Sequence, residues 1–287
     1  MVYTSVDQPV AEPILREFEK QSGIRVDIRT DAEASKSVGL AERLRAERGN
    51  PACDVWWGNE VFHTIRLADE GVLAGYASPA GKDISDQFKD TDGKWYSTGL
   101  RARVIAQHGA LGAEHASVRA LTDPALRGRV AMARPTAGTT GGHVAALYAA
   151  WGADAADAFF RGLRANEVRL VGGNSVVAEQ VGQGTFVLGL TDNDDVDAAL
   201  AAGGEVRAVV PDQDGLGTLT MPTTVALVAG APRPDEARKL IDAKFAGWSV
   251  RGGATGIKSM SVDYREVARV MPAAVRRATD ILDGRTP

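Results

Sequence analysis

The chain has almost no cysteine, since Cys53 is the only one among 287 residues. A single thiol cannot form an internal disulfide, and one cysteine with four scattered histidines does not match the ligand spacing of a zinc site. We therefore expect Cys53 to be a small buried apolar residue. The sequence also contains no run of about 18 apolar residues, so no membrane-spanning helix is predicted.

The sequence also lacks a large excess of either charge sign, and it lacks the common catalytic motifs. The net charge is −4 and no basic stripe occurs, which argues against a nucleic-acid partner. Neither a G-x-S-x-G elbow nor an H-E-x-x-H pair is present, and the four histidines lie far apart in the sequence. We therefore expect a protein that is not an enzyme and has no catalytic residues.

What the chain does contain is an alternation of short β-rich runs with helical patterns. Apolar residues make up 44% of the sequence, enough for a sizeable core, and the 32 glycines suit many strand-to-helix turns. The alternation predicts α/β architecture with mostly parallel sheets flanked by helices. Strands are expected at 2–6, 24–28, 54–57, 97–106, 129–133, 168–171, 185–190, 206–210 and 219–228. Helices are expected at about 10–22, 35–48, 60–70, 143–151, 153–165, 175–181, 234–248 and 264–282.

The order of these elements predicts two lobes with discontinuous boundaries. One α/β set ends near residue 98 and a second runs to about 217, and extended segments lie where the chain changes set. Lobe 1 is expected to comprise 1–98 plus about 221–268, and lobe 2 about 103–217 plus about 269–287. A chain that crosses twice has a natural pair of hinge strands, here near 98–105 and 217–225.

Polar residues follow several of the predicted strands. In open parallel sheets, ligands bind beyond the carboxyl ends of the strands, so these positions are candidates for a binding site. The first strand is followed by Ser5 and Asp7, and the third by Asn59 and Glu60. In the second lobe, such positions carry Thr136–Gly142, Asn174 and the acidic residues from Asp192 onward.

Two of these positions open helices. Backbone N–H groups and hydroxyls in Thr136–Gly142 could hold an anion at the positive end of the following helix. The segment lacks the lysine of a phosphate-binding P-loop, so no nucleotide is expected. Asn174 can donate and accept, which also suits an anion or a metal-bound oxygen. Both features are explained equally well as a tight turn and a helix cap without any ligand.

Asp192, Asp194 and Asp195 place three carboxylates within four residues. Packed together, they repel one another and raise each other's pKa unless a cation joins them. Hard cations prefer such oxygen ligands, although the spacing excludes an EF-hand loop. The alternative is a solvated acidic turn that caps the helix beginning near Val196.

Seven segments, in this order along nearly the whole chain, resemble the ferric-iron-binding periplasmic proteins of ABC importers. They are Val2–Ser5, Phe18–Val26, Asp54–Trp57, Glu70–Leu73, Pro135–Gly138, Asn174–Val176 and Pro222–Leu227. The resemblance implies the two-lobed periplasmic-binding-protein fold of type II, with two hinge strands and a closing cleft. It also implies an extracytoplasmic protein, periplasmic or membrane-anchored, whose signal segment is absent from this chain.

The resemblance further implies a ligand set. Two adjacent tyrosines hold iron in such relatives, and Asp194 and Asp195 stand at the matching positions here. Asp7 falls near a histidine ligand of some relatives, and Asn59 or Glu60 near a glutamate ligand. The implied metal ligands are Asp7, Glu60, Asp194 and Asp195. A synergistic anion, phosphate or carbonate-like, is implied at a further set of residues: Ala137, Gly138, Thr139 and Asn174.

The sequence therefore predicts a monomeric solute-binding protein that delivers its ligand to the membrane permease of an ABC importer. The first hypothesis for the ligand is ferric iron or another hard cation, possibly with a synergistic anion. The second is a small phosphorylated or phosphonate organic ligand held by the same residues, with Ser5 and Asp192 contributing. An enzyme on the same two-lobed fold is the third, and it lacks a visible acid, base or nucleophile arrangement.

Overall fold

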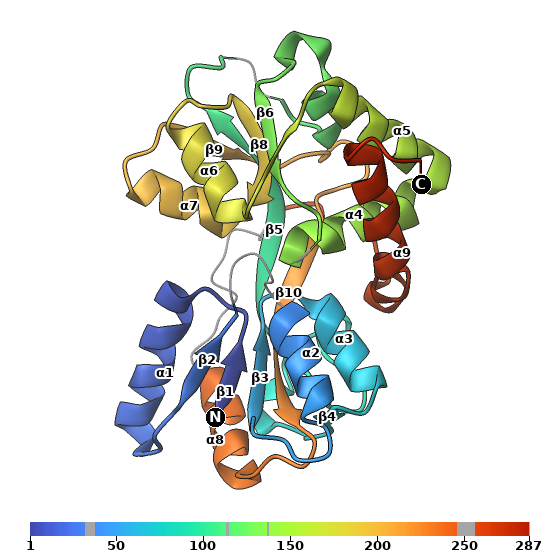
Figure 1. The fold of residues 1–287 in the computed structure, drawn as a ribbon. Coiled ribbons are helices and arrows are strands. Elements are labelled where there is room, and N and C mark those ends of the chain that lie inside the picture. Colours follow the sequence, from blue (N-terminus) through green and yellow to red (C-terminus); the bar gives the residue numbers. More distant parts are fainter. Residues whose placement is uncertain (32–37, 113–114, 137, 246–255, 287) are drawn as a thin grey trace. The chain divides into compact units, whose positions relative to one another are not determined.

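The chain forms two compact units, each with its own sheet and helices (Figure 1). The computed structural model describes all residues except 32–37, 113–114, 137, 246–255 and 287. Unit 1 consists of Met1–Leu100 with Met221–Arg251, and unit 2 of Arg101–Thr220 with Gly252–Pro287. Two of the points at which the chain changes unit, after Leu100 and after Thr220, lie within the segments for which hinge strands are predicted, and hinge bending there stays a prediction.

The sheet of unit 1 is mixed, with both parallel and antiparallel pairings. β1 (Val2–Thr4) lies between β2 (Ile28–Thr30) and β3 (Val55–Gly58) and is parallel to both. β10 (Thr220–Val228) pairs antiparallel with β3, and the short β4 (Leu73–Ala74) pairs with β10. One edge strand differs from the sequence prediction, because β2 begins at Ile28 rather than at Ile24.

Helices cover both faces of this sheet. α1 (Gln8–Ser22) and α8 (Pro234–Phe245) contribute to one apolar cluster with side chains of β1, β3 and β10. α2 (Val38–Ala46) and α3 (Val61–Asp69) pack against each other. The buried residues of α1 are Ala11, Leu15 and Phe18, spaced by four and three residues as a helical face requires. Val10, in the first turn of the same helix, is 46% exposed.

The sheet of unit 2 joins strands from both ends of its sequence. β8 (Leu188–Asp192) is parallel to β6 (Val130–Ala133) and antiparallel to β5 (Tyr96–His108). β7 (Arg169–Val171) extends the sheet beyond β6, and β9 (Val206–Val209) pairs with β5. The predicted α/β character is confirmed in both units, and each sheet combines parallel with antiparallel pairings.

Five helices flank this second sheet. Figure 1 shows α6 (Asn174–Gly182) and α7 (Asn193–Ala201) on one side of it. On the other side lie α4 (Gly138–Trp151), α5 (Ala153–Ala165) and α9 (Tyr264–Leu282). α9 packs along α4 and α5, so the predicted lobe boundary near residue 268 falls inside one continuous helix of unit 2.

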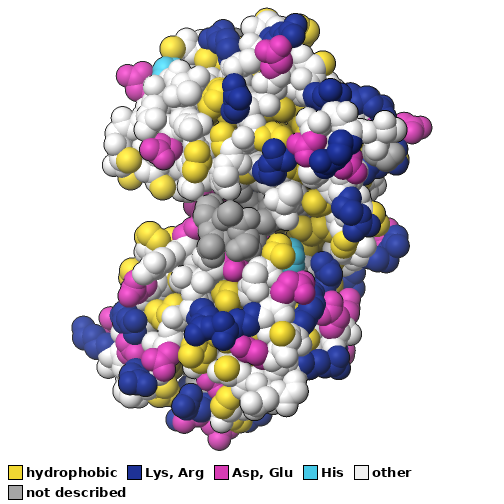
Figure 2. All heavy atoms as spheres, viewed as in Figure 1, with side chains coloured by type: hydrophobic (Ala, Val, Ile, Leu, Met, Phe, Trp, Pro, Cys, Tyr) yellow, Lys and Arg dark blue, Asp and Glu magenta, His cyan; other side chains and the backbone are white. Residues whose placement is uncertain are grey.

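The surface carries charges of both signs. On the face drawn in Figure 2, Lys and Arg side chains are interspersed with Asp and Glu side chains. Among the described residues, no helix combines the length and apolar character needed to cross a membrane. Cys53 is fully buried, as expected from the sequence.

Candidate functional site

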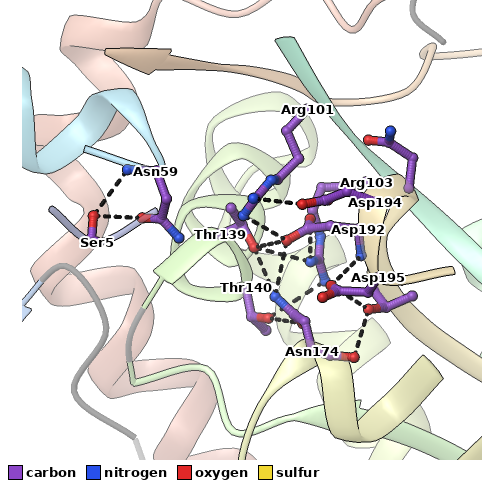
Figure 3. A network of polar contacts seen from close by, with 12 residues as sticks. Ser5, Asn59, Arg101, Arg103, Thr139, Thr140, Asn174, Asp192, Asp194 and Asp195 are labelled. Atoms are coloured by element: carbon purple, nitrogen blue, oxygen red, sulfur yellow. Dashed lines mark hydrogen bonds and ion pairs between the residues drawn. The ribbon is translucent and has the colours of Figure 1, made fainter. Parts of the chain in front are cut away.

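A cluster of polar and charged side chains lies in unit 2, where β8 ends and three helices begin (Figure 3). Asp192 is the last residue of β8, and Asp194 and Asp195 stand in the first turn of α7. Thr139 and Asn174 come from the first turns of α4 and α6. The predicted convergence of strand-end residues therefore holds within this unit.

Two arginines of β5 complete the cluster. Arg101 and Arg103 are two residues apart on a strand, so their side chains lie on the same face of the sheet. Arg103 is directly opposite Asp192 in the antiparallel pairing of β5 with β8. Its Nη1 donates to Asp192 Oδ1 at 2.7 Å, and the two residues are 0% and 1% exposed. Cross-strand register thus sets up a buried ion pair.

The second carboxylate oxygen of Asp192 accepts hydrogen bonds from residues in the first turns of α4 and α6. Thr139 Oγ1 donates to Asp192 Oδ2 at 2.5 Å, and Asn174 Nδ2 donates to the same oxygen at 3.1 Å. We call the Arg103 guanidinium, the Thr139 hydroxyl and the Asn174 amide the cradle. Thr140 Oγ1 donates to Asn174 Oδ1 at 2.8 Å, which fixes the orientation of the Asn174 amide.

Local packing positions the cradle. Gly138 has a φ of +59°, a value that favours glycine and turns the chain into α4 just before Thr139. α6 lies close against β8 because Gly189 has no side chain: a Cβ there would collide with Val177. This close approach holds the first residue of α6, Asn174, beside the end of β8.

The two guanidiniums determine the protonation of the buried groups. Burial alone would raise the pKa of Asp192, but Arg103 and Arg101 together lower it below its usual value, so the carboxylate stays charged. Burial, assisted by the charge of Arg103, lowers the pKa of His143 far below its usual value. The neutral His143 ring lies beneath Arg103, with Nε and Nδ1 3.5 Å apart.

Asp194 and Asp195 form the more accessible part of the site. Arg101 Nη2 donates to Asp194 Oδ2 at 2.6 Å. Burial, followed by repulsion from Asp192 and Asp194, raises the pKa of Asp195 to about 7. Each of the three aspartates offers one oxygen, and these oxygens lie within 4.8 Å of one another. With two arginines present, the net charge of the cluster is −1 when Asp195 is ionised and zero when it is protonated.

Ser5 and Asn59 belong to unit 1 and contact each other. Ser5 Oγ donates to Asn59 Oδ1 at 3.1 Å and accepts from the Asn59 backbone N–H at 2.9 Å. Ser5 follows β1 and Asn59 follows β3, which are adjacent parallel strands, so their proximity follows from the topology. Both side chains are almost completely buried.

Glu60 caps the helix that follows it, and its assignment as a metal ligand stays a prediction. It is 0% exposed and caps α3, accepting from the backbone N–H groups of Phe62 and His63 at 2.6 and 3.2 Å. His63 Nδ1 lies 2.9 Å from Glu60 Oε1. Both carboxylate oxygens of Glu60 therefore contact residues of its own helix. Asp7 is partly exposed ahead of α1, and its role stays a prediction.

The anion-binding prediction is also modified. Thr139 and Asn174 do converge, but the group they hold is the carboxylate of Asp192. Gly138 shapes the turn, and Ala137 lies outside the described residues. Sequence reasoning missed both arginines. The available signal was Arg-Ala-Arg at 101–103 inside an otherwise apolar extended segment, where two charges on one strand face require buried partners.

Comparison with known proteins identifies the family. Residues 1–243 match the family of bacterial extracellular solute-binding proteins, and the chain belongs to this family. A curated relative, iron uptake protein A1 of Synechocystis sp., is 26% identical over 253 residues, which cover 84% of this chain and 69% of that protein. The resemblance found in the sequence is thereby confirmed.

Solved structures agree on the fold. The periplasmic binding protein AfuA from Actinobacillus pleuropneumoniae, with fructose-6-phosphate bound, has a TM-score of 0.86 at 18% identity, covering 98% of both chains. The ferric binding protein from Campylobacter jejuni has a TM-score of 0.82 at 19% identity, covering 99% of this chain and 98% of that one. The predicted periplasmic-binding-protein fold is confirmed, and this family consists of binding proteins rather than enzymes.

Proposed function

We propose that this protein captures ferric iron or another hard cation outside the cytoplasmic membrane and delivers it to the permease of an ABC importer. The observation that carries the proposal is the acidic trio, Asp192, Asp194 and Asp195, whose oxygens lie within 4.8 Å of one another. Clustered carboxylates are the ligands that hard cations prefer. The similarity to an iron uptake protein supports the same ligand class.

The three aspartates do not contribute equally. Asp192 is buried and paired with Arg103, so Asp194 and Asp195 are the direct ligands in this proposal. A cation would take over Asp194 from Arg101 and displace the proton from Asp195. Binding should therefore release a proton and weaken as the pH falls below about 7. The role of Asp7 as a ligand stays a prediction from the sequence.

The test is isothermal titration of the metal-free protein with ferric nitrilotriacetate and with gallium, which is redox-inert. Asp194→Asn combined with Asp195→Asn should abolish saturable binding, because two of three carboxylates become neutral amides. Asp197→Asn is the matched control, since Asp197 lies exposed on the same helix and outside the trio. Equal affinities in all variants would refute the assignment of the site.

A small phosphorylated or phosphonate organic ligand is the second candidate. It is favoured by the guanidinium of Arg101, which is bonded to the partly exposed Asp194, and by the likeness to a sugar-phosphate-binding neighbour. An anion would compete with Asp194 for Arg101, so Arg101→Met should abolish its binding. Under the cation proposal the same variant should bind metal more tightly, because Asp194 loses its competing partner.

The remaining parts of the proposal follow from the family. Extracellular solute-binding proteins hand a small ligand to a membrane permease, so we propose a periplasmic or membrane-anchored monomer that leaves its ligand chemically unchanged. Size-exclusion chromatography with light scattering tests the monomer. Recovery of an altered ligand after prolonged incubation would contradict a purely binding role and revive an enzymatic one.

A further inference from the structure

We infer that Asp192 is a built-in anion: its carboxylate permanently fills the cradle of Arg103, Thr139 and Asn174, so the site needs no separate small anion. The inference rests on the proposed function only in taking this cluster as the ligand site. It assigns Asp192 a positioning role and leaves direct ligation to its neighbours on α7.

The geometry shows an anion site that is already satisfied. Three donors from three different elements converge on the two oxygens of one carboxylate, at 2.7 Å from Arg103, 2.5 Å from Thr139 and 3.1 Å from Asn174. These elements are β5, α4 and α6. Two of the donors stand in the first turns of helices, where backbone partial charges favour an anion.

The cradle and the carboxylate that it binds are shielded from solvent. Arg103 is fully buried, and the Asp192 carboxylate has only 1% exposure. An unpaired guanidinium in such a place would be strongly unfavourable, so it must always meet an anion. Asp192 supplies that anion through a covalent tether, with Oδ1 2.7 Å from Arg103 Nη1.

A second small anion would gain little here. Phosphate or bicarbonate approaching Thr139 and Asn174 would have to displace a tethered carboxylate that is present at high effective concentration. If it bound beside that carboxylate, it would meet repulsion from Asp192. The cradle is thus closed to a second small anion, whereas Arg101, which pairs with Asp194, lies outside the cradle.

The first experiment measures the thermal stability of the metal-free wild-type protein with phosphate, bicarbonate or acetate, each against sodium chloride at equal ionic strength. No metal is involved, so the result is independent of the proposed cation. The expected outcome is no saturable shift in Tm. A saturable rise of about 3 to 5 °C, the size expected at ten times Kd, would overturn the inference.

The second experiment empties the cradle. Asp192→Ala leaves Arg103, Thr139 and Asn174 around a carboxylate-sized space, so formate or acetate should raise its Tm saturably. Asp192→Asn fills the same space with a neutral amide and should show no such rescue. Asp194→Ala, which removes a carboxylate outside the cradle, should show none either.

If Asp192→Ala folds but its Tm does not rise saturably with formate or acetate, the inference is overturned. Rescue of Asp194→Ala to the same extent would also do so, because the effect would then lack the predicted specificity. Should Asp192→Ala fail to fold in every buffer, the wild-type measurement decides alone. Loss of ferric binding in all of these proteins would contradict the proposed function without affecting the anion results.

Discussion

Removing one member of the Arg103–Asp192 pair should destabilise unit 2 severely. Arg103→Met keeps an apolar stem of similar length but deletes the 2.7 Å ion pair and the 3.2 Å contact with Thr139 Oγ1. Asp192 is then a buried charge whose remaining charged partner is the more distant Arg101, with Nη1 3.7 Å from Asp192 Oδ2. The expected loss is about 3 to 5 kcal/mol, the usual cost of leaving one buried charge without its partner.

Combining the change with Asp192→Asn should recover much of that loss. Each single variant leaves one buried charge without its closest partner, whereas the double variant removes both members of the pair. The double variant should therefore be more stable than the sum of the single losses predicts, by about 2 kcal/mol or more. Additivity within about 0.5 kcal/mol would refute the reasoning, because it would mean that the two charges do not depend on each other.

The assay is equilibrium urea unfolding followed by circular dichroism, with hydrogen–deuterium exchange to resolve unit 2. The second readout matters because two units need not unfold in one transition. Arg127→Met is the matched control: Arg127 pairs with Glu167 at 2.6 Å, but both side chains are more than half exposed. Screening by solvent limits its expected loss to about 1 kcal/mol or less.

Three further predictions concern single groups. Asp195 has a folded pKa of about 7 against 3.8 ordinarily, so the folded state binds the extra proton and wild-type stability should fall as the pH rises between these values. Asp195→Asn removes this loss, and its stability relative to wild type in urea melts should increase by about 2 to 3 kcal/mol from pH 5 to pH 8. An unchanged difference would contradict the raised pKa. Asp157 accepts hydrogen bonds from Nε and Nη2 of Arg277, each at 2.7 Å, and so links α5 to α9. Asp157→Asn should lower the free energy of unfolding by about 1.5 to 3 kcal/mol, measured by urea unfolding. An unchanged free energy of unfolding would show that this ion pair does not contribute to stability. Burial raises the pKa of Cys53 to about 12, so a thiol reagent should label it only after denaturant is added, and rapid labelling of the native protein would refute its burial.

The fold was predictable because its signals are local. Amphipathic spacing and glycine stops predict the long helices, and the predicted range of the last one, 264–282, is the observed α9. Strand ends were less accurate. β8 runs to Asp192 rather than ending at Leu190, because pairing with β5 continues to Arg103. Such pairing is a tertiary property that hydrophobic periodicity does not contain.

The binding residues were predictable only in part. Position after a strand correctly brought Thr139, Asn174 and Asp192 together, because parallel strands end at one edge of the sheet. The same rule selected Glu60, whose carboxylate caps the next helix, a role that an acidic residue after a strand serves equally well. Sequence position alone does not distinguish a carboxylate directed to a ligand from one bonded to its own helix.

The arginines explain why a chain can carry three adjacent carboxylates at a site that lacks a tyrosine pair. Carboxylates clustered without compensation would repel one another and take up protons. Arg103 neutralises Asp192 permanently because both are buried, whereas Arg101 neutralises Asp194 reversibly because Asp194 remains partly exposed. The net charge of the unliganded cluster is thereby kept near zero, and only the Arg101–Asp194 ion pair can be replaced by a ligand. A ligand that brings positive charge replaces Arg101 and a proton, so its affinity depends on how easily those two are released.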